Sequence, residues 1–316
     1  MSTHKKEAIR TLSSNVEQAL PMLLKYKEEF WLNHCNFILN DFLLPWARRN
    51  LHSQELECDQ YVILIENRID NQWLFTVLNT LLMSPPKTGF CLITDKQSQK
   101  KAQSMLQSHE IIINNINLVI DEIFPGTYLS EKSALNKLMK NSIFWEKLPH
   151  ERLLMIQTDA LLSEPLPRYF FDFNYLGAPF LPRQNSEYFE NHSDNGEIIN
   201  FFKVETPIHG SPNKEVYPHL YGNGGLSIRN RSVMKQICEE YGTKTTEAEQ
   251  EDVFFSRHLN KVFSPEPIHI AKAFAFETTY NKSAIGSHAA WKYLNNRDLA
   301  EYFEKHLKKV WSMVNT

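Results

Sequence analysis

The feature that most constrains the fold is a series of short, uninterrupted apolar runs separated by helical patterns. The runs occupy residues 61–65, 89–94 and 153–156. An unbroken apolar run is typical of a strand that is buried on both faces, as in a parallel sheet covered by helices. Residues 72–82 and 97–108, which lie between the runs, have helical character. The alternation predicts an α/β domain with a mixed, mostly parallel sheet flanked by helices.

Several shorter segments are less regular. Residues 111–113 and 118–120 are further strand candidates, and Ser130 is expected to cap a helix that follows it. Residues 183–215 form a long polar stretch. Loops of that length are often functional lids. We therefore expect an acceptor loop or lid there, with a passive excursion of the chain as the alternative.

The two ends of the chain differ from the α/β domain, which we place at residues 59–294. Residues 1–58 predict a helical extension whose apolar spacing is broken at Pro21, and residues 295–316 predict an amphipathic helix. The extension carries several aromatic side chains. It is expected to pack on the main domain, or alternatively to contact a partner protein or a membrane surface.

Charge and cysteine usage exclude some classes of protein. With 34 basic and 37 acidic residues the net charge is −3, so the chain lacks the basic excess of a non-specific nucleic-acid binder. The four cysteines form no CxxC pair, which argues against a zinc cluster or a disulfide framework. No apolar run reaches the ~18–20 residues of a membrane span, and no signal peptide is recognisable. A cytoplasmic protein without a transmembrane segment is expected.

Polar residues directly follow two of the predicted strands. Glu66 and Arg68 follow the first run, and Gln157, Thr158 and Asp159 follow the third. Ligands of parallel sheets bind outside the carboxyl ends of the strands, so these residues should meet at one rim. A carboxylate at Asp159 suits a divalent ion that also binds a diphosphate. On local evidence Asp159 could equally be a turn former.

Two later segments could carry chemistry. Residues 222–225 contain three glycines, which either let a ligand approach the backbone closely or form a tight turn. The pattern is not GxGxxG, so it is no dinucleotide fingerprint. Glu251 and Asp252 precede an apolar helical run. They could stabilise the helix N-terminus, or Asp252 could act in a site as a base.

Five segments follow one another along the chain: Gln157–Asp159, Asn174–Phe180, Gly222–Arg229, Glu251–Asp252 and Gly286–His288. This order, with Gly222–Arg229 as its most specific block, resembles a little-characterised family of GT-A-like glycosyltransferases. The resemblance runs from about residue 60 to residue 292. It implies a GT-A fold and a nucleotide-diphosphate-sugar donor, with a UDP-sugar as the expected kind.

The resemblance also implies roles for individual residues. Asp252 matches the base that deprotonates the acceptor hydroxyl in an inverting transfer, with Glu251 beside it. The donor-binding residues implied in the same way are Glu66, Arg68, Gln157, Thr158, Asp159, Asn223, Gly224 and Gly225. The acceptor would be a glycan, a lipid or a protein. A retaining reaction, in which Asp252 only orients the acceptor, is the alternative.

The family's Asp-x-Asp motif corresponds here to Gln157-Thr158-Asp159, which retains one carboxylate. The resemblance implies Asp159 and His288 as ligands of Mn²⁺ or Mg²⁺. Because Gln157 carries no charge, metal dependence could be weak or absent, and a nucleotide-sugar-binding protein without catalysis remains an alternative. A nucleotidyltransferase is the other enzyme class that uses strand-end carboxylates, but residues 66–70 lack the glycine-rich loop typical of that class.

Overall fold

The computed structural model describes most of the chain, and the structural statements below concern that part. The described residues are 3–52, 57–113, 115–129, 133–179, 187–192, 198–203, 216–217, 222–245, 249–262, 268–278 and 280–315. Within them, no helix is long and apolar enough to cross a membrane. The expected cap at Ser130 lies outside the described residues.

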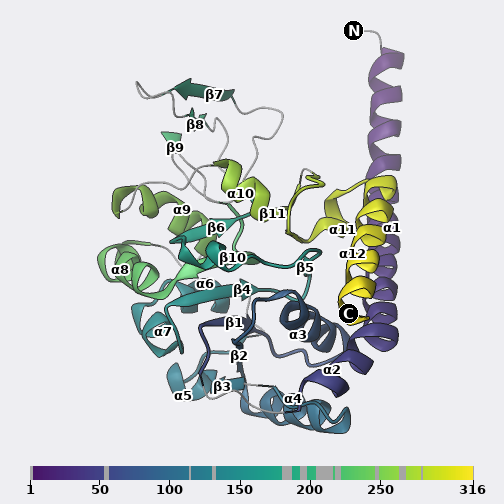
Figure 1. The fold of residues 1–316 in the computed structure, drawn as a ribbon. Helices are drawn as coiled ribbons and strands as arrows, with labels where there is room; N and C mark the ends of the chain where they lie inside the picture. Colours follow the sequence, from purple (N-terminus) through teal and green to yellow (C-terminus); the bar gives the residue numbers. More distant parts are fainter. Residues whose placement is uncertain are drawn as a thin grey trace.

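A six-stranded sheet in the order β3-β2-β1-β4-β10-β6 forms the centre of the molecule (Figure 1). Its strands are β1 (Gln60–Ile65), β2 (Thr88–Thr94), β3 (Asn115–Val119), β4 (Arg152–Ile156), β6 (Tyr175–Gly177) and β10 (Leu226–Asn230). Strands β1 to β4 run parallel, whereas β10 is antiparallel to both β4 and β6. The mixed, mostly parallel α/β architecture expected from the sequence is confirmed.

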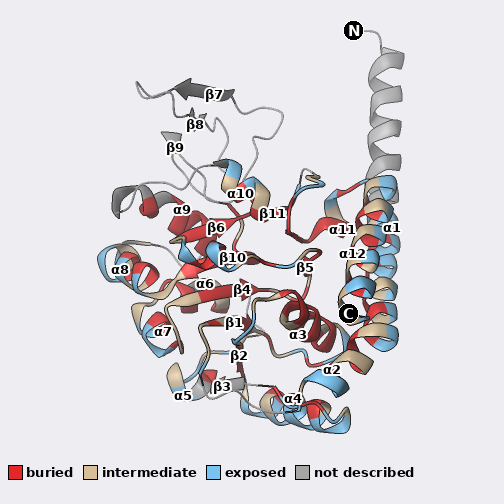
Figure 2. Cartoon of the chain, in the orientation of Figure 1, coloured by how far each residue is buried: buried red, intermediate tan, exposed pale blue. Residues whose placement is uncertain are grey.

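The central strands are apolar on both faces because each face supports its own core. In β1, Val62 and Leu64 belong to one hydrophobic cluster, whereas Ile63 between them belongs to the other. All three side chains are fully buried. Figure 2 shows this burial along the strands at the centre of the sheet. An alternating pattern would have left one face in water, so the continuous apolar run is what two helical layers require.

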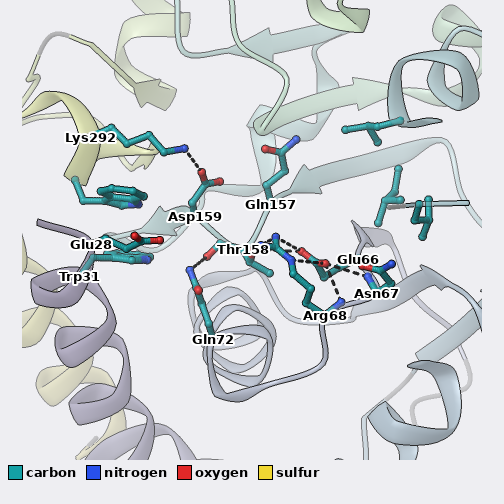
Figure 3. A pocket seen from close by; sticks show the side chains of 14 residues that line it. Glu28, Trp31, Glu66, Asn67, Arg68, Gln72, Gln157, Thr158, Asp159 and Lys292 are labelled. Atoms are coloured by element: carbon teal, nitrogen blue, oxygen red, sulfur yellow. Dashed lines mark hydrogen bonds and ion pairs between the residues drawn. The ribbon is translucent and has the colours of Figure 1, made fainter. Parts of the chain in front are cut away.

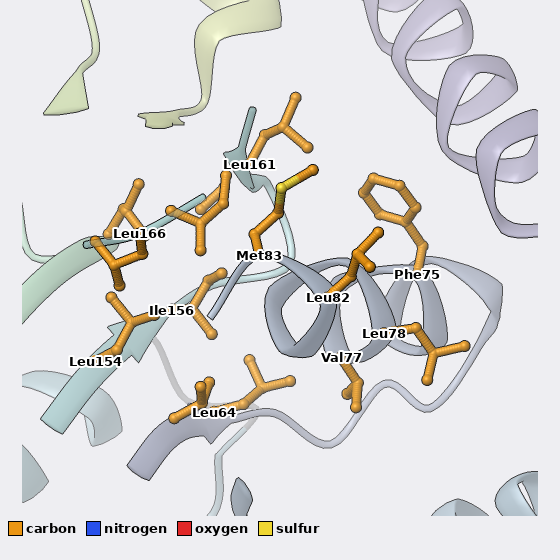
Figure 4. Packing of buried hydrophobic residues seen from close by; sticks show 14 of the residues in the cluster. Leu64, Phe75, Val77, Leu78, Leu82, Met83, Leu154, Ile156, Leu161 and Leu166 are labelled. Atoms are coloured by element: carbon orange, nitrogen blue, oxygen red, sulfur yellow. The ribbon is translucent and has the colours of Figure 1, made fainter. Parts of the chain in front are cut away.

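Helices cover both faces of the sheet. One layer contains α1 (Thr3–Ile38), the π-helical turn η1 (Leu39–Leu43), α2 (Leu44–Asn50), α3 (Asn71–Met83), α4 (Lys96–Ser108) and α12 (Asn296–Val314). The other contains α5 (Ile120–Ile123), α6 (Ala134–Met139), α7 (Ser142–Lys147), α8 (Arg231–Tyr241) and α9 (Glu251–Val262). Figure 4 shows α3 packed against side chains from β1 and β4. The Asp70 carboxylate caps α3 by accepting from the Trp73 N–H at 3.0 Å.

Two smaller sheets complete the fold. Strands β5 (Ala160–Leu162), β11 (Ala275–Phe276) and β12 (Gly286–His288) form one, and β7 (Glu187–His192), β8 (Ile198–Lys203) and β9 (Val216–Tyr217) form the other. The short helices are α10 (Ile268–Phe274), α11 (Ala290–Tyr293), η2 (Arg168–Asp172) and η3 (Gly242–Lys244). The β5–β12 pair joins the segment after β4 to the C-terminal part of the chain.

Three local expectations differ from the structure. Pro21 does not interrupt α1, because it lies on an exposed part of the helix, where water can replace the hydrogen bond that proline cannot donate. Residues 111–113 form only an isolated bridge, from Ile112 to His52. Of residues 118–120, Val119 ends β3 and Ile120 begins α5. These runs are too short for periodicity to fix their type.

The polar stretch 183–215 is not simply a loop. Its described parts are the antiparallel strands β7 and β8, and its remaining residues lie outside the described residues. The sequence already contained a signal, because residues 198–202 are mostly β-branched or aromatic, as strands prefer. The expectation of an acceptor loop or lid stays a prediction.

The C-terminal half of α1 belongs to the core of the domain. Trp31, Cys35 and Ile38 are buried in the same cluster as the residues of α3. This part of α1 packs against α3, α11 and α12. The Lys27 Nζ donates to the Leu294 carbonyl at 2.6 Å, which ties α1 to the segment before α12. The predicted extension therefore packs on the main domain.

A buried chain of polar groups links α1, α12 and α3. The Asn79 amide oxygen accepts from His306 Nε2 at 2.8 Å, so His306 Nδ1 is the acceptor for His34 Nε2 at 2.9 Å. The Asn79 amide nitrogen donates to the Leu162 carbonyl. Burial, and then the neighbouring His34, lower the pKa of His306 well below its usual value. His306 is thus neutral in the folded state.

The hydrogen-bonded groups around His306 predict a protein stability that depends on pH. Below pH ~6.5 an unfolded histidine takes up a proton that buried His306 does not, so the unfolded state binds more protons and stability falls as pH decreases. Urea unfolding at pH 7.5 and pH 5 should show a loss about 2 kcal/mol larger in the parent than in His306→Gln. The exposed His269→Gln is the control and should keep the parental loss. Equal losses in all three proteins would contradict the prediction.

Candidate active site

A pocket of about 790 Å³ opens at the carboxyl ends of β1 and β4 (Figure 3). Its walls come from the segments after these strands, from the start of α3, and from α1 and α11. The lining residues are Glu28, Trp31, Ile65, Glu66, Asn67, Arg68, Gln72, Leu129, Leu135, Gln157, Thr158, Asp159, Trp291 and Lys292. The volume is typical of a small-molecule site.

The Glu66 carboxylate shapes one side of the pocket. Its Oε1 accepts from the backbone N–H groups of Asn67 and Arg68 at 3.0 and 2.9 Å. Its Oε2 accepts from Arg68 Nη2 at 2.7 Å. Glu66 is 9% exposed, whereas the Arg68 side chain is 74% exposed. Glu66 therefore fixes the turn after β1, and Arg68 presents a guanidinium group to the pocket and to solvent.

The triplet after β4 is held by three different parts of the fold. The Gln157 N–H donates to the Gly225 carbonyl at 2.8 Å. The Thr158 carbonyl accepts from Gln72 Nε2 at 2.8 Å, and the Asp159 carbonyl accepts from the Ala289 N–H at 3.0 Å. These hydrogen bonds to the backbone of residues 157–159 hold the strand end in place and so position its side chains.

Asp159 lies between two cationic groups. Its Oδ1 is 3.2 Å from His288 Nε2, and its Oδ2 is 2.7 Å from Lys292 Nζ. The pairing of β12 with β5 aligns His288 with Ala160, which is why a residue far along the chain reaches this carboxylate. Burial disfavours the charged form of Asp159, but His288 and Lys292 outweigh it and hold the carboxyl pKa well below its usual range.

His288 uses both ring nitrogens. Nε2 is also 3.1 Å from the Gln157 amide oxygen, and Nδ1 is 3.1 Å from Glu277 Oε1. Burial alone would lower the pKa of His288, but the two carboxylates, Asp159 and Glu277, raise it to about 9. In this arrangement His288 is a cation near neutral pH, and Gln157 accepts from it without adding a charge.

The glycines at 224 and 225 make room for the groups on either side of them. A β-carbon on Gly225 would overlap the His288 ring, and one on Gly224 would overlap the Glu251 carboxylate. Asn223 fixes the loop by accepting from the Gly225 N–H at 2.6 Å and donating to Glu277 at 3.2 Å. The loop thus separates the Asp159–His288 pair from the acidic residues at the start of α9.

Glu251 and Asp252 are adjacent in sequence but have different surroundings. Glu251 pairs with both terminal nitrogens of Arg229, at 2.6 and 2.9 Å. The Arg229 guanidinium is fully buried and lies over three aromatic rings, those of Trp145, Tyr175 and Phe255. The carboxylate of Glu251 therefore satisfies a buried charge.

Asp252 lacks a basic partner of its own among the described residues. Its carboxylate accepts from the N–H groups of Val253 at 2.8 Å and Gly224 at 3.4 Å. Burial, and then the negative charge of Glu251, raise the pKa of Asp252 to about 7, against the opposing effects of these hydrogen bonds and of Arg229. A carboxyl group with such a pKa can exchange a proton near neutral pH.

The side chains around Asp159 include oxygen and nitrogen donors that could ligate a metal ion. Among the described residues, no group of three or more His, Cys, Asp and Glu side chains is arranged to hold a metal ion. Asp159 Oδ1, His288 Nε2 and the Gln157 amide oxygen do face one another. This donor set fits a divalent ion only if substrate oxygens supply further ligands, as is common for Mg²⁺ at phosphates.

Comparison with known families identifies the chain as a member of one whose function has not been assigned. Residues 120–289, just over half of the chain, match the family described as "Protein of unknown function (DUF5672)", and the protein belongs to this family. No curated protein sequence matches the chain.

Several solved structures resemble this structure at low similarity. The glycosyltransferase GlyE of Streptococcus pneumoniae TIGR4 has 9% identity and a TM-score of 0.41, over 81% of this chain and 62% of GlyE. The galactosyltransferase LgtC, solved with donor and acceptor sugar analogues, has 12% identity and a TM-score of 0.42, over 81% of this chain and 96% of LgtC. Mouse xyloside xylosyltransferase 1 has 11% identity and a TM-score of 0.41, over 74% of this chain and 98% of that enzyme. The chain thus spans about three fifths of GlyE, and similarity this low does not extend to function.

The structure brings together most of the residues singled out in the sequence. The five that follow β1 and β4 line one pocket, and His288, which is not itself a lining residue, contacts Asp159. The loop 223–225 packs against the His288 ring, and Asp252 contacts this loop through the Gly224 N–H. The pocket residues that the sequence did not indicate are Glu28, Trp31, Gln72 and Trp291. Lys292 could be read as an ordinary solvated lysine from sequence, and only its contact with Asp159 distinguishes it.

Because Glu251 and Asp252 have different surroundings, replacing each should lower the free energy of unfolding by a different amount. Glu251→Gln leaves the Arg229 charge buried without a counter-ion, which should cost about 3–5 kcal/mol of unfolding free energy. Asp252→Asn removes a carboxyl that burial already disfavours, so it should cost less than about 1 kcal/mol at pH 8. Urea unfolding of both variants measures the difference. A similar loss of unfolding free energy in both variants would show that the ion pair with Arg229 is not the main stabilising contact of Glu251.

Proposed function

We propose that this protein is a glycosyltransferase of the GT-A type that transfers a sugar from a nucleotide diphosphate to an acceptor hydroxyl. The observation that carries the proposal is the placement of basic side chains at one strand-end carboxylate. His288 and Lys292 contact Asp159 at the carboxyl end of a parallel sheet, and Arg68, which pairs with Glu66, lines the same pocket as Asp159. Such a group can neutralise a leaving diphosphate, which is the main electrostatic demand of the reaction.

The donor is proposed to lie across this strand end. Its nucleoside would occupy the side formed by Glu66 and Arg68, where a guanidinium group can stack on a base or pair with a phosphate. Its diphosphate would lie beside Asp159 and Lys292. A UDP-sugar is the proposed donor, in keeping with the resemblance of the sequence pattern to GT-A-like enzymes.

A divalent ion, Mn²⁺ or Mg²⁺, would be held by Asp159, with the Gln157 amide oxygen beside it and with His288 once its ring has lost a proton, and the ion would then supply the positive charge to the diphosphate in place of that of His288. The residues of the chain supply part of this charge themselves. Lys292 already contacts Asp159, and its ammonium group can turn toward a diphosphate oxygen. Gln157 stands in place of a second carboxylate. The site should therefore bind a metal ion more weakly than a site with two carboxylates would.

Asp252 is proposed as the base. Its carboxylate would take the proton of the acceptor hydroxyl while the hydroxyl oxygen forms a bond to the anomeric carbon. The bond from that carbon to the diphosphate oxygen breaks, and the diphosphate leaves with the electron pair. This direct displacement inverts the anomeric centre. Glu251 acts differently, as a positioning residue, because its contact with Arg229 fixes the start of α9 and the place of Gly224.

The first prediction of this proposal concerns donor binding. In the presence of Mn²⁺, Asp159→Asn should weaken the binding of a UDP-sugar by at least about tenfold, because the variant loses the one charged ligand that would hold the ion against the diphosphate. Isothermal titration calorimetry with and without Mn²⁺ measures the effect. Asp172→Asn is the control, because Asp172 forms only a surface pair with Arg152. Parental affinity in Asp159→Asn would place the donor elsewhere.

The second prediction concerns the chemical step. Asp252→Asn should lower kcat by about 10²–10⁴-fold and leave donor affinity nearly unchanged, because a base meets the acceptor and not the nucleotide. Release of UDP from a UDP-sugar with water as the acceptor is the assay. The parental rate should rise with pH to a plateau above about pH 7, as Asp252 loses its proton.

The same assay separates catalysis from binding alone. A protein that binds the donor but never releases UDP, with any acceptor, would be a binding protein and would contradict the proposed transfer. Glu251→Gln should lose stability first, and any folded fraction should keep the parental pH profile. A pH profile that disappears in Glu251→Gln but persists in Asp252→Asn would move the base by one residue.

A further inference from the structure

Helix α1 carries a second apolar face that does not point into the core. Its core-facing residues, among them Trp31, Cys35 and Ile38, are buried in the same cluster as α3. At about 100° per residue, five other apolar side chains fall within about 100° of arc on a different side of the helix. They are 38–75% exposed: Met22, Leu23, Tyr26, Phe30 and Phe37. A helix that is apolar on two sides is usually covered on both.

Helix α12 extends this second face. Figure 1 shows α1 and α12 side by side at one edge of the molecule, and the rings of Phe30 and Phe303 lie 5.2 Å apart. Where α1, η1 and α12 meet, a groove of about 530 Å³ is lined by Phe37, Phe42, Leu307, Lys308, Trp311 and Ser312. Trp311 is 60% exposed. We refer to Met22, Leu23, Tyr26, Phe30, Phe37 and Trp311 as the outer face.

Exposed apolar side chains concentrate on the outer face. Of the eleven large apolar side chains that are exposed in the described part of the chain, six belong to it, and the other five are spread over different parts of the chain. An aromatic side chain has about 150–250 Å² of surface, so at these exposed fractions the six offer roughly 600 Å² together. Apolar patches of this size often mark interaction sites on a protein surface.

The charges beside the outer face favour a protein over a membrane as its partner. An anionic bilayer attracts clusters of about four to eight basic residues. The exposed charged residues along the outer face instead include three of each sign: Lys25, Glu29, Asp41, Arg297, Glu304 and Lys308. A face with balanced charges can meet a copy of itself. In an antiparallel pair of α1 helices, Lys25 can lie opposite the partner's Glu29, and symmetry repeats the pairing.

A second copy would also bury enough surface for a stable dimer. A standard protein interface buries about 800 Å² on each partner. The six side chains of the outer face supply roughly three quarters of that area. The half-buried Phe42 and Leu307 and the charged residues beside them offer further surface.

We propose that the outer face is an interface between two copies of this chain, which pair about a two-fold axis through α1 and α12. Closed two-fold dimers are the commonest assemblies of soluble proteins. None of the six residues of the outer face lines the pocket at the carboxyl ends of β1 and β4. The pairing therefore does not depend on which ligand that pocket binds.

Sedimentation velocity of the full chain between about 1 and 100 μM tests the dimer. The parent should reach a mass of twice 37.0 kDa within this range. Tyr26→Arg and Trp311→Arg each place a charge in the outer face and should raise the dimer Kd at least about tenfold. Both side chains are more than half exposed, so the variant monomers should fold and keep the far-UV circular dichroism of the parent.

Tyr169→Arg is the matched control. Tyr169 is 54% exposed, against 59% for Tyr26, but it lies on η2, which contacts β4 and β10. This variant should form the dimer as the parent does. A dimer that Tyr169→Arg also abolishes would not be specific to the outer face and would overturn the proposal.

Three further results would contradict the dimer. A parent that stays monomeric over the whole concentration range overturns it. A dimer that persists in both Tyr26→Arg and Trp311→Arg shows that two copies meet elsewhere, and overturns it as well. Flotation with vesicles of phosphatidylserine and phosphatidylcholine examines the other occupant. Vesicle binding by a monomeric parent that both outer-face variants lose would assign the outer face to a membrane.

Discussion

The ion-paired carboxylate of Asp159 is the contact on which the arrangement of the site depends. It draws together the end of β4, the strand β12 through His288 and the helix α11 through Lys292. The end of β4 lies more than a hundred residues before β12 and α11 in the sequence. Because the carboxylate is largely buried, its negative charge has to be compensated by the two cationic side chains, and it compensates their positive charge in turn. In the proposed function, a phosphate of the ligand would replace Asp159 as the partner of His288 or Lys292. These cationic groups already lie where such an anion would bind.

The loop 223–225 divides the site into two parts with opposite electrostatic character. On one side, His288 and Lys292 provide positive charge beside Asp159. On the other side, Asp252 is a buried carboxyl group that burial and a neighbouring charge keep partly protonated near neutral pH. Glycine at 224 and 225 lets the two parts approach without a side chain between them. The proposed transfer would use both properties, because its leaving group requires positive charge and its attacking hydroxyl requires a base.

Helix α1 is part of the site as well as part of the core. The same turns of α1 that bury Trp31 and Cys35 against α3 also bring Glu28 to the pocket. The hydrogen bonds among His34, His306 and Asn79 hold α1 and α12 against α3. Anything that loosens this docking, such as protonation of the histidines, therefore also alters one wall of the pocket. The helical extension and the candidate active site are coupled through shared side chains.

The sequence by itself determined three strands of the central sheet, β1, β2 and β4, and the polar residues that follow β1 and β4. Continuous apolar runs at residues 61–65, 89–94 and 153–156 are compatible only with strands covered on both faces or with short buried helices, and their length favours strands. The polar residues after the first and third runs therefore had to meet at one edge. The difference between Glu251 and Asp252 could not be read in the same way, because both are acidic and adjacent.

Only the tertiary structure decided which side chains meet across long separations. The register of β12 against β5 brings His288 to Asp159, and no local pattern encodes that register. The burial of Arg229 selects Glu251 as its partner and leaves Asp252 with backbone donors alone. The packing of α1 on α3 adds Glu28 and Trp31 to the pocket, although helical periodicity shows only that α1 has an apolar face. Periodicity reports which face of an element is buried, whereas the partner that buries it is set by packing between elements.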